Sequence, residues 1–324
     1  MPVAPGSTRR NGHRGERGGG DASSMAASSR LADLSGLTVV VVGASTGIGR
    51  GVALRAASFG AAVVVFSRRP DALTSLVERI RDSGGRAHAV AGDVSRAGDL
   101  ERLADEAETV FGRIDVWAHN AGVGTIGLFG DVPIEEHVRV VETNLIGAMR
   151  GAHVALRRFI AQGSGVLVNT ASVESVVPLA YQASYAATKA GLLSLTQTLQ
   201  QELRLTGVSG VAVAAVLPWA VRTPFWRHAG NHAGRALRMP LMDEPEPVVD
   251  AILRAGLRPR VAQPAGWKAR ASLIGARLAP RVTARLSADI ADARVRRGAK
   301  TPPSDGALFE PLADPATVAE TPRR

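Results

Sequence analysis

Short apolar runs alternate along the chain with longer segments of helical periodicity. The runs are mainly Val, Ala, Leu and Ile, and they predict buried strands at Leu37–Val42, Ala62–Phe66, Ala87–Ala91, Ile114–His119, Val166–Asn169 and Val211–Val216. Apolar residues at every third or fourth position predict helices at Gly49–Ser58, Asp71–Asp82, Ala97–Phe111, Glu135–Ala161 and Gln182–Thr206. This alternation is typical of βαβ units, so the pattern predicts an α/β fold with a doubly wound parallel sheet of the Rossmann type.

The two ends of the chain differ from this pattern. Residues 1–30 are rich in Gly, Ser and Arg with few large apolar residues, which predicts a disordered basic tail, and Met25 is a second candidate start. Residues 31–263 form the predicted catalytic domain, residues 264–297 a basic amphipathic helical extension, and residues 298–324 a Pro-rich disordered tail.

The composition excludes several classes of protein. The 324 residues include no cysteine, which rules out disulfides, thiolate metal sites and cysteine nucleophiles and fits a reducing cytoplasm. No apolar run approaches the roughly 20 residues that span a bilayer, and no signal-peptide core is present. We therefore expect a cytoplasmic protein.

The net charge of +10 resides at the ends of the chain. Residues 1–30 contribute +3 and residues 251–324 contribute +8, whereas residues 31–250 are close to neutral at −1. A nucleic-acid-binding domain would place its basic residues on the folded body, so this distribution argues against nucleic acid as a partner. Binding of a polyanion or an anionic membrane by the ends remains an alternative.

A glycine-rich loop follows the first predicted strand and precedes a helix. It comprises Gly43, Ala44, Ser45, Thr46, Gly47, Ile48 and Gly49. Glycine lets a pyrophosphate approach the backbone, and the first N–H groups of the helix attract its negative charge. The loop therefore predicts a dinucleotide site, although a tight turn alone would need the same glycines.

The end of the second strand bears on the choice of cofactor. Ser67, Arg68 and Arg69 stand there, and no acidic residue precedes Asp71. A carboxylate at this place would accept a hydrogen bond from the adenosine ribose, whereas guanidinium groups pair with a 2′-phosphate. NADP(H) is therefore the preferred cofactor, with NAD(H) as the alternative.

Tyr185 and Lys189 are spaced four residues apart on a predicted helix, which places both side chains on one face. A nearby ammonium lowers the pKa of a phenol, so the pair is suited to acid–base catalysis. Ser172 follows the fifth strand at the edge where parallel sheets place active sites, and its hydroxyl is suited to hold a carbonyl oxygen.

Together these residues resemble the short-chain dehydrogenase/reductase family over about residues 36–257. Gly43, Gly47 and Gly49 match the family's glycine loop, and Asn144, Ser172, Tyr185 and Lys189 match its catalytic positions. Further matches to its cofactor-contacting segments are Asp93, Val94, Asn120, Ala121, Gly122, Pro218, Val221 and Thr223.

The resemblance implies a mechanism. A reduced nicotinamide would give hydride to a carbonyl carbon while Tyr185 donates a proton, Lys189 holds the nicotinamide ribose, Ser172 orients the carbonyl and Asn144 anchors a relay water. The substrate would be a small carbonyl compound or alcohol. The family also implies a homodimer or homotetramer built through two long helices. A nucleotide-binding scaffold or sensor without significant turnover is the alternative.

Two departures from the family pattern concern the end of the core. Trp219 follows Pro218 where the family usually has glycine, so the loop there is altered or Trp219 walls the substrate pocket. The usual last strand is missing, with Arg260–Gln263 as a candidate remnant.

The predicted substrate-facing residues are mostly apolar and favour a lipophilic substrate. They are Val173, Glu174, Val176, Val177, Pro178, Leu179, Phe225 and Trp226. For Glu174, a specificity contact and a solvent-facing position are both open.

Three histidines are candidates for other roles. His228 and His232 have the spacing of a metal pair but no third ligand nearby, so no metal is predicted, and His119 is interpreted as a satisfied core histidine.

Residues 266–290 show an apolar helical stripe with basic flanks, and Pro280 is expected to kink or divide the helix. Packing on the domain or on another subunit is the preferred interpretation of the stripe, and peripheral membrane contact is the alternative.

Overall fold

The computed structural model describes residues 1, 33–236, 241–313 and 317–319. The chain divides into an N-terminal unit, Met1–Ala32, and a larger unit, Asp33–Arg324, which contains the sheet and the site. The tail predicted for residues 1–30 lies outside the described residues, apart from Met1.

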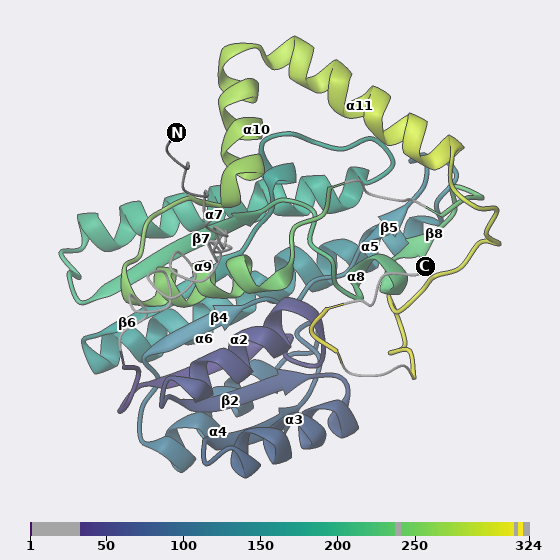
Figure 1. Cartoon of the computed structure of the whole chain (residues 1–324). Coiled ribbons are helices and arrows are strands. Elements are labelled where there is room, and N and C mark those ends of the chain that lie inside the picture. The colour runs from purple at the N-terminus through teal and green to yellow at the C-terminus, as the bar shows by residue number, and fades with distance from the viewer. Residues whose placement is uncertain (2–32, 237–240, 314–316, 320–324) are drawn as a thin grey trace. The chain divides into compact units, whose positions relative to one another are not determined.

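A seven-stranded parallel sheet runs through the described part of the larger unit in the order β3-β2-β1-β4-β6-β7-β9 (Figure 1). Its strands are β1 (Thr38–Val42), β2 (Ala62–Ser67), β3 (Arg86–Ala91), β4 (Val116–His119), β6 (Gly165–Thr170), β7 (Val211–Pro218) and β9 (Gln263–Ala265). The chain winds outward on one side of β1 through β2 and β3, and on the other side through β4. Loops diverge at this switch point, so the predicted doubly wound fold is confirmed and a crevice opens at the carboxyl ends of the strands.

The central strands are apolar throughout because helices cover both faces of the sheet. All five residues of β1 and all six of β2 are buried. Val40 pairs with Val64 on one side and with Trp117 on the other, so β-branched and aromatic side chains, which favour strands, fill the centre.

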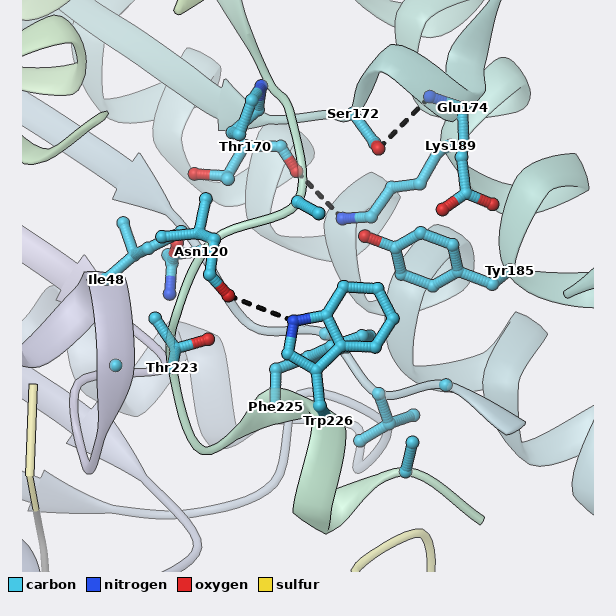
Figure 2. Close-up of a pocket in the computed structure, with 18 of the residues that line it drawn as sticks. Ile48, Asn120, Thr170, Ser172, Glu174, Tyr185, Lys189, Thr223, Phe225 and Trp226 are labelled. Carbon is cyan, nitrogen blue, oxygen red and sulfur yellow. Dashed lines mark hydrogen bonds between the residues drawn. The ribbon is translucent and has the colours of Figure 1, made fainter. Parts of the chain in front are cut away.

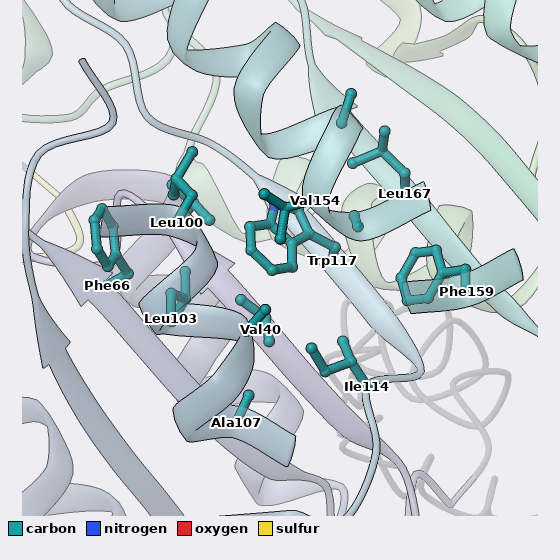
Figure 3. Packing of buried hydrophobic residues seen from close by; sticks show 14 of the residues in the cluster. Val40, Phe66, Leu100, Leu103, Ala107, Ile114, Trp117, Val154, Phe159 and Leu167 are labelled. Atoms are coloured by element: carbon teal, nitrogen blue, oxygen red, sulfur yellow. The ribbon is translucent and has the colours of Figure 1, made fainter. Parts of the chain in front are cut away.

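Three helices pack on each face. One group comprises α2 (Gly47–Ser58), α3 (Pro70–Asp82) and α9 (Pro245–Leu257), and the other comprises α4 (Asp99–Phe111), α6 (Gly147–Gln162) and α7 (Ala183–Leu205). The main core lies between the sheet and the second group (Figure 3). Trp117, Phe159 and Leu103 are fully buried there, and each such side chain contributes roughly 1.5–3 kcal/mol by leaving water.

Three elements differ from the sequence prediction. The long helix expected over residues 135–161 consists of α5 (Ile134–Val141), a π-helical turn η1 (Glu142–Ile146) and α6. The last strand is present after all, since β9 pairs with the end of β7. A small second sheet of β5 (Thr125–Ile126) and β8 (Gly230–Asn231) was not predicted, because strands this short leave no periodic signal.

The C-terminal extension forms two helices, α10 (Gly266–Leu278) and α11 (Pro280–Arg296). Pro280 occupies the first turn of α11, so it divides the helix as predicted. Two short elements complete the fold near the site, η2 (Val173–Ser175) and α8 (Phe225–His228). Among the described helices, none combines the length and apolar character that a bilayer span requires.

Residues 298–313 pack on the domain, in contrast to the disordered tail predicted from their Pro content. Ser304 exchanges backbone hydrogen bonds with Asn231, and Leu308 is fully buried. The composition misled here because backbone carbonyl groups, rather than a large apolar set, provide most of the contacts of this segment.

Candidate active site

A cavity of about 560 Å³ opens at the carboxyl ends of the strands, within the size range of small-molecule sites. It extends from the loops after β1 and β2 to the helices α10 and α11. Of the residues predicted as catalytic or cofactor-binding, all except Gly49 and Asn144 line it. The structure therefore brings together side chains from six separate strand ends.

The glycine loop turns tightly against its neighbours. Gly43 has a φ of +86°, and a Cβ there would lie 2.6 Å from the backbone nitrogen of Ala121. A Cβ on Gly49 would lie 2.1 Å from the carbonyl oxygen of Gly43, although Gly49 itself faces away from the cavity. Only glycine fits at these two positions.

The first turn of α2 is suited to hold an anion. Thr46 precedes the helix without capping it through its side chain, and no acidic residue stands in the first turn. Free N–H groups and the helix dipole there fit a pyrophosphate, so these residues fit a dinucleotide. The N–H of Gly47 donates to the carbonyl oxygen of Thr317 at 2.7 Å, so the C-terminal segment reaches this same place.

Arg68 is also engaged by the C-terminal segment. Its guanidinium donates to the carbonyl oxygens of Ala307 at 2.6 Å, Leu308 at 3.0 Å and Phe309 at 2.9 Å. Arg68 still lines the cavity together with Ser67 and Arg69. The residues predicted to hold a 2′-phosphate thus lie at the correct strand end, and backbone oxygens already contact one of them.

Asp93 and Val94 lie at the end of β3, as the resemblance implies. The carboxylate of Asp93 accepts hydrogen bonds from Arg139 at 2.6 Å and from Ser95. Arg139 in turn donates to Leu308 at 3.0 Å, which fixes the C-terminal segment to the same corner.

Ser172, Tyr185 and Lys189 converge at the opposite end of the cavity (Figure 2). Ser172 follows β6, whereas Tyr185 and Lys189 lie one turn apart on α7. The ammonium of Lys189 donates to the carbonyl oxygen of Thr170 at 2.8 Å and lies 5.5 Å from the centre of the Tyr185 ring.

The pKa of Tyr185 is raised above 10, opposite to the direction predicted from Lys189 alone. Burial is the main cause and the charge of Glu174 adds to it, whereas a hydrogen bond with Ser172 acts to lower the pKa. Burial also lowers the pKa of Lys189 to about 8. The prediction was wrong because it considered the neighbouring charge and not the loss of water around the phenol.

Asn144 lies in the π-helical turn and does not face the cavity. Its side chain accepts from the N–H of Val123 at 2.8 Å and donates to the carbonyl oxygen of Val123 at 2.9 Å and to Thr188 at 3.2 Å. It therefore fixes the loop after β4 against α7.

Glu174 faces Tyr185 and Lys189 inside the cavity (Figure 2). Its Oε2 atom is buried and has no hydrogen-bond partner among the described residues. Burial raises the pKa of this carboxyl to about 8, against a lowering effect of Lys189. The sequence left open whether Glu174 makes a specificity contact or faces solvent, and in the structure its side chain lies inside the site.

The outer part of the cavity is walled by apolar and aromatic side chains. Of the predicted set, Val173, Val177, Leu179, Phe225 and Trp226 line it, whereas Val176 and Pro178 are exposed outside it. Trp219 also lines the cavity and has a negative φ, so the loop after β7 accommodates it without strain. The sequence missed the contribution of α10 and α11, which add Trp267, Ala271, Leu286 and Ile290.

The three histidines named in the sequence analysis have different surroundings in the structure. His119 is buried as predicted, but neither ring nitrogen has a hydrogen-bond partner among the described residues, so it is not satisfied. Burial lowers its pKa to about 3. His228 ends α8, and His232 lies beyond the helix with its Nε2 2.6 Å from Glu136, so the pair does not share a helix face.

Comparison with known proteins agrees with this geometry. The profile of the family described as "short chain dehydrogenase" matches residues 37–233. The uncharacterized oxidoreductase YxnA of Bacillus subtilis is 33% identical over 260 residues, covering 79% of this chain and 73% of that protein. The 3beta-hydroxysteroid dehydrogenase 1 of Eggerthella lenta is 38% identical over 194 residues, covering 59% and 73%.

A solved structure gives the same result. A short chain dehydrogenase/reductase from Burkholderia phymatum, in complex with NAD, superposes with a TM-score of 0.68 at 25% identity, covering 84% of this chain and 99% of that one. Family profile, relatives and fold all agree on the class of protein. The chain therefore belongs to the short-chain dehydrogenase/reductase family of Rossmann-fold oxidoreductases.

Proposed function

We propose that this protein is an NADP(H)-dependent oxidoreductase that interconverts a lipophilic ketone and its alcohol, with Tyr185 as the acid–base group. The observation that supports this most is the convergence of Ser172, Tyr185 and Lys189 in one cavity with the glycine loop. A nicotinamide held in this cavity supplies or accepts hydride. The remaining chemistry belongs to the residues of the chain.

Ser172 and Tyr185 would act together on the substrate oxygen. The hydroxyl of Ser172 orients the carbonyl, and the phenol of Tyr185 gives its proton to the oxygen as hydride reaches the carbon. A raised pKa keeps Tyr185 protonated, as a proton donor must be. Oxidation of the alcohol uses the same groups in reverse, and there the positive charge of Lys189 would stabilise the phenolate.

Lys189 and Asn144 would support the reaction indirectly, by holding the cofactor and by organising proton return. The hydrogen bond from Lys189 to the carbonyl oxygen of Thr170 supports a role of its ammonium in holding the nicotinamide ribose. The amide of Asn144 joins the loop after β4 to α7, which supports a role in organising the path by which a proton returns to Tyr185.

The preference for NADP(H) rests on Arg68, Arg69 and Ser67 at the end of β2. An acidic side chain there would repel a 2′-phosphate, and none of the three is acidic. NAD(H) is the alternative, since the similar Burkholderia protein was solved with NAD.

The lipophilic substrate is supported by the aromatic and aliphatic lining from Phe225 to Ile290. The Eggerthella relative is named as a hydroxysteroid dehydrogenase, and a steroid is a substrate of this class. Cyclic and long-chain ketones are therefore the first compounds to test.

We further propose a homodimer or homotetramer, as the family resemblance implies. The helices α5 and α6 and the turn η1 between them expose Val138, Ile146 and Met149, between 38% and 49% accessible, which would be covered by a second copy. Light scattering of the purified chain measures the oligomeric state.

A nucleotide-binding protein without significant turnover is the second candidate. In either candidate a dinucleotide would compete with the hydrogen bond from the N–H of Gly47 to Thr317.

The deciding experiment follows the absorbance of NADPH and of NADH with a panel of ketones. We expect faster turnover with NADPH, loss of that preference in Arg68→Asp, and a fall of about 10²–10⁴ in kcat in Tyr185→Phe. Calorimetry should show that Tyr185→Phe still binds NADPH. Absence of turnover with retained NADPH binding in the wild type would support the second candidate.

A further inference from the structure

The helices α10 and α11 expose six large apolar side chains. We call this set the apolar ridge; its members and accessible fractions are Trp267 72%, Ile274 57%, Leu278 78%, Val282 65%, Leu286 58% and Ile290 38%. Single exposed apolar residues are ordinary, but a patch of this kind on two adjoining helices marks a contact surface. Figure 1 shows the two helices meeting at an angle at the upper edge of the domain.

Most charged side chains around the apolar ridge are basic, and the acidic ones on its helices are Asp289 and Asp292, which flank Ile290 on α11. Arg270, Arg277, Arg281 and Arg285 are exposed, and the structure gives them no ion pair or hydrogen bond with any described residue. No acidic residue occurs between Gly266 and Ala288. Two other basic residues of these helices do form ion pairs: Lys268 pairs with Asp243 at 2.6 Å, and Arg296 pairs with Asp292 at 2.6 Å.

The apolar ridge is continuous with the cavity. Trp267, Leu286 and Ile290 belong to the ridge and also line the cavity, together with Ala271 of α10. An apolar molecule adsorbed at the ridge would therefore meet the outer wall of the site, to which the same helices also contribute Lys268, Ser272, Thr283 and Ser287.

We propose that the apolar ridge docks on the surface of an anionic phospholipid bilayer and that substrate enters the cavity from that side. Exposed Trp and Leu side chains enter the boundary between headgroups and acyl chains, while unpaired arginines contact the lipid phosphates. The proposal deepens the proposed function, on which its statement about substrate entry rests, because it specifies a substrate that partitions into lipid.

A second copy of this chain fits the ridge less well. In a two-fold contact the same patch meets itself, which would bring Arg277, Arg281 and Arg285 of both copies together. α10 carries no acidic side chain, and of the two on α11 Asp292 already pairs with Arg296, so such a contact brings mainly like charges together and is destabilised. An anionic surface complements the same charges.

Co-sedimentation of the full chain with vesicles tests the docking. Vesicles of phosphatidylcholine alone are compared with vesicles that also contain phosphatidylglycerol, at low and at high salt. We expect binding to the anionic vesicles, weakened by salt, and a loss of about tenfold in Leu278→Glu. The matched control is Leu205→Glu, since Leu205 is 74% exposed at the end of α7, away from the ridge, and should bind like the wild type.

Fluorescence gives a second, independent measurement. Trp267 is 72% exposed, whereas Trp117 is fully buried. Anionic vesicles should therefore shift the emission of the wild type to shorter wavelength, and Trp267→Phe should remove most of that shift. The proposal is overturned if Leu278→Glu and Leu205→Glu sediment equally, or if the wild type binds neither vesicle.

Two further measurements separate this proposal from its alternatives. If light scattering without vesicles shows an oligomer that Leu278→Glu dissociates, a second copy covers the ridge and the proposal is wrong. Turnover of a water-soluble ketone should be unchanged in Leu278→Glu. Vesicle binding needs no turnover, so an inactive protein that still binds vesicles would overturn the proposed function and leave the docking intact.

Discussion

The guanidinium of Arg68 donates a 2.6 Å hydrogen bond to the carbonyl oxygen of Ala307, 239 residues further along the chain. Leu308 and Phe309 accept two more hydrogen bonds from the same group, and Thr317 accepts one from the N–H of Gly47. The C-terminal segment thus contacts both groups expected to bind the phosphates of a dinucleotide. Its contacts bear directly on cofactor affinity.

Truncation after Ala313 should tighten binding of NADPH. It removes the carbonyl oxygen of Thr317 and releases the N–H of Gly47, while the contacts of residues 307–309 with Arg68 remain. A hydrogen bond of this kind contributes about 0.5–1.5 kcal/mol, which corresponds to a gain of roughly 2- to 12-fold in affinity. Calorimetric titration measures it. Thr317→Ala keeps the backbone oxygen and should bind like the wild type, and equal or weaker binding by the truncated chain would contradict the expectation.

Glu174→Gln should change how stability depends on pH. The folded state holds the proton of Glu174 up to about pH 8, whereas the unfolded chain releases it near 4.5. The free energy of unfolding of the wild type therefore falls as pH rises between these values, by at most about 1.4 kcal/mol per pH unit. The variant lacks this contribution to the pH dependence, so its free energy of unfolding relative to that of the wild type should rise with pH. Urea denaturation at several pH values measures this difference. Glu101→Gln serves as the control, because Glu101 is exposed on α4. If the free energy of unfolding of Glu174→Gln depended on pH in the same way as that of the wild type, the expectation would be wrong.

His119→Leu should protect the fold against acid. Burial keeps His119 neutral with a pKa of about 3, while the unfolded chain binds a proton below about 6.5. Stability of the wild type is thus lost as pH falls through this window, by up to about 1.4 kcal/mol per pH unit, and leucine removes that loss. Thermal unfolding from pH 7 downward measures the difference, with His153→Gln, on the exposed side of α6, as control. An unchanged slope would show that another group determines the acid sensitivity.

Gly49→Ala should disrupt the glycine loop. The new Cβ would lie 2.1 Å from the carbonyl oxygen of Gly43 and 2.9 Å from the side chain of Asn120, so backbone must move. We expect a loss of about 1–3 kcal/mol in stability together with weaker dinucleotide binding. Gly130→Ala is the matched control, because nothing lies within 4 Å of its Cβ position. Equal stability of the two variants would be inconsistent with the close contact at Gly49.

The sheet, its covering helices and the glycine loop could be predicted because each depends on local pattern. A run such as Thr38–Val42 is buried on both faces in almost any α/β protein, and the glycines follow from a turn that other residues cannot make. The spacing of Tyr185 and Lys189 fixes their common face on α7, so their meeting could be foreseen as well.

The remaining features depend on contacts between distant segments. Whether Glu174 faces water or the cavity depends on the turn η2, which three residues form without periodicity. The contribution of α10 and α11 to the cavity depends on where this pair of amphipathic helices packs, and their own sequence does not specify the partner. Contacts such as Arg68 with Ala307 use backbone oxygens, which every residue offers, so composition gives no signal for them.

The contact between Thr317 and Gly47 has a practical consequence for anyone preparing this protein. An affinity handle fused after Arg324 would begin only a few residues beyond a carbonyl group that touches the dinucleotide loop. We expect such a fusion to alter the apparent affinity for the cofactor. Preparations of this protein can therefore be compared only when they carry the same residues after Thr317.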